Sequence, residues 1–218
     1  MALISAFQQG FVPGLIYLLS LMLAMCVAVS FHEYAHAVVA NKLGDPTAKN
    51  MGRMTLDPTK HIDLIGLLCF VLLGIGWAKP VIVNSRNLKH FKRDDILISI
   101  AGPVMNLLLS FIFYGIWFFG TFQWSFAAND VVQQILSMLF SLNICFAVFN
   151  ILPIPPLDGF HVVTSLFVRK NYRVVEVLQR YGYIILILLL ASGFLTGLLN
   201  IVTTWLEGIY SSFFLLFL

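Results

Sequence analysis

Three long stretches of this sequence, residues 1–41, 94–168 and 181–218, contain no lysine or arginine. All thirteen basic residues lie between them, nine from Lys42 to Arg93 and four from Arg169 to Arg180. The chain is 60% hydrophobic and 11% charged, whereas a soluble domain has about 25% charged residues. A nucleic-acid surface would spread basic residues among polar neighbours, but basic residues that flank apolar stretches follow the positive-inside rule. We therefore expect a multi-pass protein in a lipid bilayer, with both basic intervals in the cytoplasm and no nucleic-acid partner.

The long apolar stretches predict the membrane spans. A helix needs about 20 apolar residues to cross a bilayer. Four segments reach this length, and they are residues 11–40, 96–119, 131–152 and 183–200. Four crossings with cytoplasmic basic intervals place the amino terminus outside. The remaining apolar tail, residues 201–218, contains one acid, Glu207, and is either an interfacial helix or a further span.

Residues 64–77 are apolar but too short for a simple crossing. A crossing here would also put the basic residues on its two sides on opposite faces of the membrane, against the positive-inside rule. We expect a re-entrant or interfacial element, with residues 81–83 (V-I-V) as a possible short strand. The predicted fold class is therefore an all-α polytopic membrane protein with about four to six transmembrane helices and a re-entrant or short β element between the first two main spans. We expect one domain, residues 1–218, with a core at 11–168 and C-terminal helices at 169–218.

The sequence H-E-Y-A-H at residues 32–36 is the clearest candidate for chemistry. On a helix, His32 and His36 project from one face, so both imidazoles can bind one metal ion. Glu33 lies about 100° around the helix, where its carboxylate can reach a water activated by the metal. Two interfacial histidines that cap the helix are the alternative, but a carboxylate beside the apolar stretch 15–31 is costly without a partner or function. Two imidazoles and one acid suit zinc better than calcium or magnesium.

A catalytic zinc site usually has three protein ligands, and Asp158 is the candidate for the third. It follows a proline-rich segment that ends the span 131–152, and that span and the span 11–40 both run from outside to inside. The two motifs are therefore expected at similar depth on the cytoplasmic side. The alternative role for Asp158 is an N-cap of the short segment 159–167.

Together these motifs resemble the site-2 protease family of intramembrane zinc metalloproteases. The resemblance is carried by H-E-Y-A-H and by the segment from Asn150 to Gly159, which ends in L-D-G. Further similarities, in part to compact bacterial members without a PDZ or CBS domain, lie at residues 101–106 (A-G-P-V-M-N), 52–58 (G-R-M-T-L-D-P), His61 and 77–81 (W-A-K-P-V).

The resemblance implies regulated intramembrane proteolysis, in which a transmembrane protein substrate is cleaved within or at the edge of the bilayer. It implies one zinc ion (Zn2+) per chain, with His32, His36 and Asp158 as metal ligands and Glu33 as the general base. It also favours a bacterial inner membrane, where the topology above puts the active site on the cytoplasmic side.

Four further polar residues are candidates for smaller roles. Asn150 lies about two helical turns before Asp158 and is predicted to donate to the oxyanion, or else to pack one helix against another. His161 either assists the oxyanion or lies at the interface. His61 belongs to a polar loop and is predicted to be structural, and Asn106 is predicted to hydrogen-bond a neighbouring helix.

Other functions are compatible with parts of this pattern. A transporter could bind a metal ion as cargo, but such proteins tend to have two related halves, and no internal repeat is visible here. A membrane zinc hydrolase that acts on a lipid or a lipidated peptide would use the same residues. An inactive relative is disfavoured because Glu33 and Asp158 are both present. The identity of the substrate, the activating signal and the oligomeric state stay open at this point.

Overall fold

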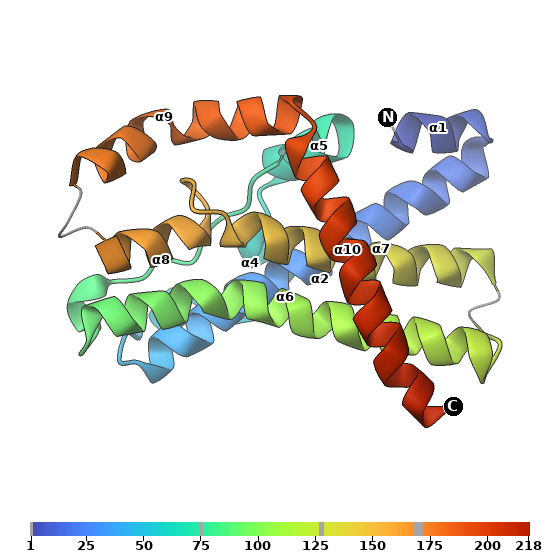
Figure 1. Ribbon diagram of the computed structural model, residues 1–218, viewed down its shortest axis with the longest axis horizontal. Coiled ribbons are helices and arrows are strands. Elements are labelled where there is room, and N and C mark those ends of the chain that lie inside the picture. Colours follow the sequence, from blue (N-terminus) through green and yellow to red (C-terminus); the bar gives the residue numbers. More distant parts are fainter. Residues whose placement is uncertain (1, 75, 127–128, 168–171) are drawn as a thin grey trace.

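The computed structural model describes residues 2–74, 76–126, 129–167 and 172–218, which form a bundle of long helices (Figure 1). The α-helices are α1 (Ala2–Gln8), α2 (Phe11–Lys42), α3 (Thr47–Asn50), α4 (Pro58–His61), α5 (Leu64–Leu73), α6 (Phe91–Phe122), α7 (Asp130–Ile151), α8 (Asp158–Phe167), α9 (Tyr172–Ala191) and α10 (Phe194–Phe214). Two short 3-10 helices, η1 (Ser85–Asn87) and η3 (Leu215–Phe217), complete the described elements. The predicted all-α fold is confirmed.

Four helices are long and apolar enough to cross a membrane, namely α2, α6, α7 and the part of α9 from Arg173 to Ala191. Large apolar side chains on their outward faces are exposed, such as Leu15, Leu19 and Leu23 of α2. In water such a surface would be unfavourable, whereas a bilayer solvates it. Length and composition therefore support the predicted number of crossings and an integral membrane protein.

The predicted span 183–200 is wrong in its boundaries. The helix that contains Tyr183 already begins at Tyr172, and it ends at Ala191. Gly193 then adopts a left-handed conformation with φ of 74°, and the Ser192 hydroxyl accepts a hydrogen bond from the backbone N–H of Phe194. This break starts α10, a 21-residue helix that is not among the four candidate spans.

Between α2 and α6, where a re-entrant or interfacial element and a short strand were expected, the chain forms the short helices α3, α4, α5 and η1. Asp63 caps α5 by accepting hydrogen bonds from two backbone N–H groups, and Gly74 ends this ten-residue helix with φ of 76°. Among the described residues there is no strand, and residues 62 and 78 form one isolated antiparallel bridge. Pro80 has no N–H to donate to a strand, and the N–H of Val81 is donated to Glu33 instead, so the strand expected at 81–83 does not form.

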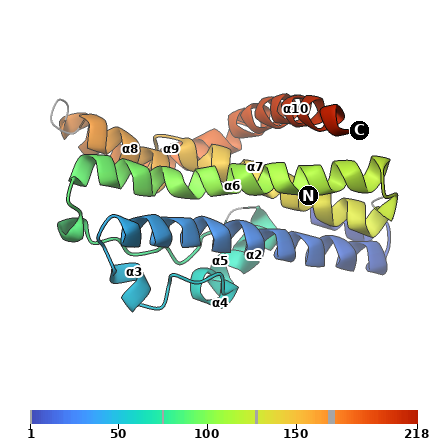
Figure 2. The same cartoon turned by 90° about the horizontal axis from the view of Figure 1, so that it is seen from below.

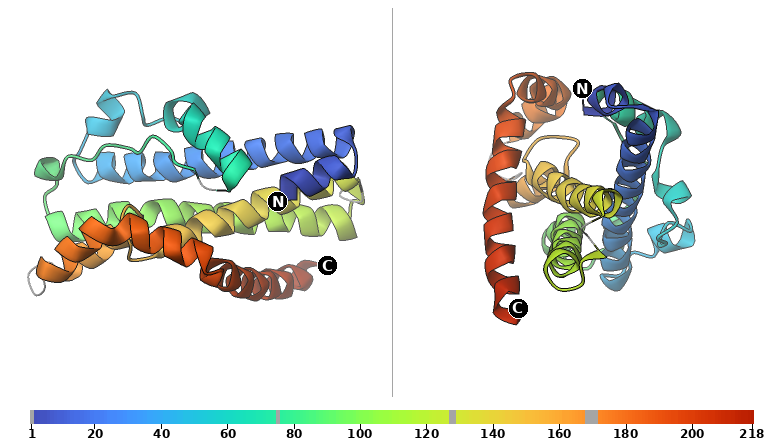
Figure 3. Two further views of the ribbon diagram at one scale, coloured as in Figure 1. Left: turned by 90° about the horizontal axis from the view of Figure 1, so that it is seen from above. Right: turned by 90° about the vertical axis from the view of Figure 1, so that its right-hand side faces the viewer.

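The helices are arranged in layers. Helices α6 and α7 lie between α10 on one side and α2 on the other, and α3 to α5 lie on the outer side of α2 (Figure 2 and Figure 3). The C-terminal end of α2, the start of α6, the end of α8 and the start of α9 share one end of the molecule, at the left of Figure 1. This end carries residues of both basic intervals.

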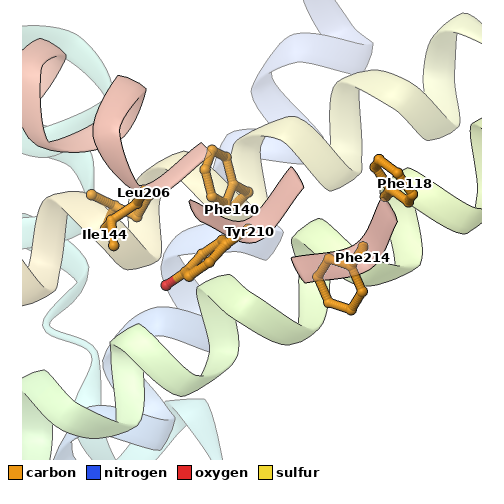
Figure 4. Packing of buried hydrophobic residues seen from close by; sticks show 6 residues of the cluster. All are labelled: Phe118, Phe140, Ile144, Leu206, Tyr210 and Phe214. Atoms are coloured by element: carbon orange, nitrogen blue, oxygen red, sulfur yellow. The ribbon is translucent and has the colours of Figure 1, made fainter. Parts of the chain in front are cut away.

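An aromatic cluster holds α10 across α6 and α7. Figure 4 shows three side chains of α10 facing three from the other two helices, and the six are Phe118, Phe140, Ile144, Leu206, Tyr210 and Phe214. The hydroxyl of Tyr210 also lies 3.2 Å from Oγ of Ser110 on α6. Within a bilayer, close packing and hydrogen bonds of this kind drive helix association, so α10 is a fixed part of the bundle.

Candidate metal centre

Two histidines of α2 and the first residue of α8 converge on one point. His32 Nε2 and His36 Nε2 are 3.0 Å apart, as expected for side chains four residues apart on one helix face. Oδ2 of Asp158 lies 3.1 Å from the first nitrogen and 3.3 Å from the second. The structure thus brings together the three residues that the sequence singled out, with all three potential ligand atoms within 4.8 Å of one another.

Two glycines permit this convergence. A Cβ atom at Gly102 of α6 would lie 2.5 Å from Nε2 of His36 and 2.6 Å from Nε2 of His32. A Cβ atom at Gly159 would collide with the carbonyl oxygen of Ile151 at the end of α7. Gly102 therefore lets α6 pack against the imidazoles, and Gly159 lets α8 turn back against α7.

In each imidazole, Nδ1, the ring nitrogen that faces away from Asp158, donates a hydrogen bond. Nδ1 of His36 is 2.7 Å from the carbonyl oxygen of Ile98, and Nδ1 of His32 is 2.6 Å from Oδ1 of Asn106. Both partner atoms can only accept, so the proton of each neutral ring lies on Nδ1 and the lone pair on Nε2. The prediction that Asn106 bonds a neighbouring helix is confirmed by its bonds to α2 and α7.

These residues fit a bound cation. Two nitrogen lone pairs and one carboxylate oxygen point at each other, and Asp158 Oδ2 is buried without a hydrogen-bond partner. Leaving such an atom unpaired in a protein interior is unfavourable, and a metal ion relieves this cost. Two imidazoles with one carboxylate, and room for a fourth ligand, are a typical catalytic zinc set.

Glu33 lies beside this point and faces the same cleft. Its side chain is almost buried, and its Oε2 accepts a 2.8 Å hydrogen bond from the backbone N–H of Val81. The cleft has a volume of about 680 Å³ and is lined in part by Glu33, His36, Asp158 and His161. The cleft extends from the point where His32, His36 and Asp158 converge, called the metal point below, to the polar end of the molecule. Lys92 also lines the wall of the cleft at that end.

The structure does not bring Asn150 to this group. Its Nδ2 donates a 3.0 Å hydrogen bond to the carbonyl oxygen of Phe146 on its own helix, and Asn150 is not among the residues that line the cleft. His161 is exposed in the cleft. His61 is the last residue of the short helix α4 and not part of a loop, and it is buried with its Nε2 2.8 Å from the carbonyl oxygen of Thr55, in agreement with a structural role.

Sequence reasoning missed two partners of the site. Asn143 of α7 is completely buried and accepts a hydrogen bond from Asn106, and the backbone N–H of Val81 holds Glu33. An asparagine in the middle of an apolar span was the available signal for Asn143. No local pattern marks a backbone N–H as the partner of a carboxylate 48 residues away.

Long apolar helices, an H-E-x-x-H pair and a distant aspartate at one point define the class of helical membrane metallopeptidases. Residues 118–189 match Peptidase family M50. The chain is 38% identical over 185 residues to "Putative zinc metalloprotease YwhC" of Bacillus subtilis (strain 168), covering 82% of this chain and 84% of the relative.

Two more distant relatives have similar descriptions. "Putative zinc metalloprotease Rip2" of Mycolicibacterium smegmatis is 28% identical over 171 residues, covering 76% of this chain and 64% of the relative. "Putative zinc metalloprotease MJ0611" of Methanocaldococcus jannaschii is 28% identical over 149 residues, covering 68% of this chain and 71% of the relative. No solved structure matches. This chain belongs to peptidase family M50 and is a membrane zinc metalloprotease of the site-2 type.

Proposed function

We propose that this protein is an intramembrane zinc metalloprotease that hydrolyses peptide bonds in transmembrane segments of protein substrates near the cytoplasmic side. The observation that carries the proposal is the convergence of His32, His36 and Asp158 beside the carboxylate of Glu33. Regulated intramembrane proteolysis in a bacterial inner membrane is the setting that these features support.

His32, His36 and Asp158 would hold one zinc ion per chain. The Nδ1 atoms of both histidines are engaged by acceptors, which leaves both Nε2 lone pairs for the metal. Zinc at this point would supply Lewis acidity, which polarises a carbonyl oxygen and makes water acidic enough to ionise near pH 7.

Glu33 would be the general base. Because Val81 N–H engages Oε2, the other carboxylate oxygen of Glu33 is left to take a proton from the attacking water. The water oxygen then bonds to the scissile carbonyl carbon, the C–N bond breaks, and Glu33 returns the proton to the leaving nitrogen.

Asn150 would donate to the oxyanion only after its amide leaves the carbonyl oxygen of Phe146. His161 already lines the cleft and could contribute a second donor there.

The cytoplasmic orientation is supported by the charge distribution. Both basic intervals contribute to the end of the molecule at which the cleft opens, and basic loops mark the cytoplasmic face of inner-membrane proteins. A substrate helix would unwind at this end, where the cleft offers polar side chains and access to water.

The substitution Glu33→Gln tests the mechanism. We expect cleavage of a single-span substrate, reconstituted with the enzyme in liposomes, to fall at least about 100-fold because the proton acceptor is lost, while zinc content stays near one per chain. Asp158→Ala should lose both zinc and cleavage. Glu176→Gln is the matched control, because Glu176 is exposed on α9 and pairs weakly with Arg180. Wild-type cleavage by Glu33→Gln would refute the assignment.

A further inference from the structure

A chain of hydrogen bonds runs from Nδ1 of His32 across the interior of the bundle. His32 Nδ1 lies 2.6 Å from Oδ1 of Asn106, and Asn106 Nδ2 lies 2.9 Å from Oδ1 of Asn143. Nδ2 of Asn143 in turn lies 2.7 Å from the carbonyl oxygen of Leu139. Both asparagines have 0% exposure. The chain therefore connects α2, α6 and α7 through groups that water does not reach.

Backbone carbonyls, which can only accept, fix the direction of each bond. Nδ2 of Asn106 also donates to the carbonyl oxygen of Ala28 at 3.0 Å, so the amide oxygen of Asn106 must face His32. Since that oxygen carries no proton, Nδ1 of His32 is the donor. His32 is thereby held in the tautomer whose Nε2 has a free lone pair, and that atom faces Asp158.

The two histidines are held in different ways. The Nδ1–H of His36 is bound by a backbone carbonyl, that of Ile98, which no substitution at this position removes. The ring of His32 depends on two side chains, Asn106 and Asn143. All three bonds of this chain point the same way, from N–H to oxygen, so each polarises the next and raises the basicity of the metal-facing nitrogen.

We propose that Asn106 and Asn143 are positioning residues that fix the tautomer and ring orientation of His32 as a zinc ligand. This inference rests on the zinc site of the proposed function. Neither asparagine is among the residues lining the cleft, so both act through His32 and not on substrate. We refer to the pair as the Asn106–Asn143 relay.

Zinc affinity distinguishes a positioning role of the two asparagines from a purely structural one. Two buried amides that only join helices would change stability when replaced, and zinc affinity would stay the same in the folded protein. A relay that orients a ligand changes zinc affinity in the folded protein, typically by 10- to 100-fold for such partners. The dissociation constant for Zn2+ therefore separates the two roles.

The test is a competition titration of purified protein in detergent with a zinc chelator. We expect Asn106→Leu, which leaves His32 Nδ1–H without its acceptor, to raise the zinc dissociation constant about 10- to 100-fold. Asn143→Ala keeps the bond between Asn106 and His32 but ends the relay, so a smaller increase is expected. Asn143→Asp should restore affinity, because a buried carboxyl group becomes neutral and can then accept from Asn106 and donate to Leu139.

Ser110→Ala is the matched control. Ser110 is also fully buried on α6, one turn beyond Asn106, and its hydroxyl bonds Leu107 and Tyr210 without reaching His32. This variant should lose stability but keep the zinc dissociation constant. The visible absorption spectrum of the cobalt-substituted protein gives a second readout, which should change in Asn106→Leu and not in Ser110→Ala.

A folded Asn106→Leu or Asn143→Ala protein with wild-type zinc affinity and cobalt spectrum would overturn the relay. If Asn106→Leu does not fold, the comparison of Asn143→Ala with Asn143→Asp decides the question, and equal zinc affinities for these two would refute it. A wild-type protein that binds no zinc would refute the zinc site itself, which is a separate result.

Discussion

At the residue scale, the absence of a side chain at Gly102 lets α6 pack against the two histidines proposed as metal ligands. A methyl group at this position would lie 2.5–2.6 Å from the metal-facing nitrogens of His36 and His32, closer than non-bonded atoms approach. We expect Gly102→Ala to lower zinc affinity at least about tenfold and to abolish cleavage, because the imidazoles must turn away or α6 must move. Alanine favours a helix more than glycine does, so helix content should not fall. Zinc titration and circular dichroism measure the two quantities.

Gly197→Ala provides the control for this prediction. Gly197 lies within α10, and nothing comes within 4 Å of a Cβ atom added there. This variant should bind zinc and cleave substrate like the wild-type protein. Normal zinc binding and cleavage by Gly102→Ala would show that α6 can retreat from the histidines without loss.

The residues of the site that could be predicted from the sequence are those whose positions follow from helical spacing and from the direction of the spans. The spacing of His32 and His36 fixes a shared helix face, and the direction of two spans placed Asp158 at the same depth. The side-chain direction of Asn150 depends on a rotamer that the sequence does not encode locally, and in the structure its amide is bound to its own helix. The role of Asn143 depends on a contact with a residue 37 positions away, which a single sequence does not reveal.

At the scale of elements, Asp45 connects the end of α2 to the segment before α6. Its side chain is completely buried and accepts hydrogen bonds from Thr47, from the backbone N–H of Asn84 and from the side chain of Asn87. Burial acts to raise the pKa of the Asp45 carboxyl, but these hydrogen bonds outweigh it and hold the pKa below its ordinary value. The same segment contains Val81, so this connection supports the backbone that contacts Glu33.

We expect Asp45→Asn to lower the stability of the protein at pH 7 by about 1.5–3 kcal/mol, the usual value for hydrogen bonds to a charged group. Because the pKa of Asp45 is lower in the folded state, its stabilisation is complete above the unfolded pKa of about 3.9 and is lost as the pH falls through the folded value. The difference between wild type and Asp45→Asn should therefore shrink below about pH 4. Thermal unfolding in detergent across this range measures it. A difference that is constant with pH would contradict the prediction.

The bounds of a helix could be predicted where the length of an apolar segment determines them. They could not be predicted where the conformation of a single residue determines them. The long helices α2, α6 and α7 follow from uninterrupted apolar segments. The end of α9 depends on the left-handed conformation of Gly193, and an apolar run on both sides hides that break. The strand expected at 81–83 required a partner strand, and its backbone is used by Glu33 instead.

At the scale of the whole molecule, residues of both basic intervals and the candidate metal centre lie toward the same end of the bundle. The cleft is lined by Glu33 and Asp158 near the metal point and by Lys92 from a basic interval. A protease with this arrangement would receive water and the unwound part of a substrate from the cytoplasm, while the apolar faces of α2, α6 and α7 remain in lipid. The sidedness of the chain is therefore part of the proposed mechanism.

Single cysteines introduced at the two ends test this sidedness. The three native free cysteines, Cys26, Cys69 and Cys145, are first replaced by alanine. Leu56→Cys then marks the segment between α2 and α6, and Gln123→Cys marks the segment between α6 and α7; both native side chains are exposed. In intact bacterial spheroplasts, a membrane-impermeant maleimide should label Gln123→Cys at once and Leu56→Cys only after permeabilisation, because the basic interval stays in the cytoplasm. Labelling of Leu56→Cys in intact spheroplasts would place the active site on the outer face and refute the cytoplasmic orientation.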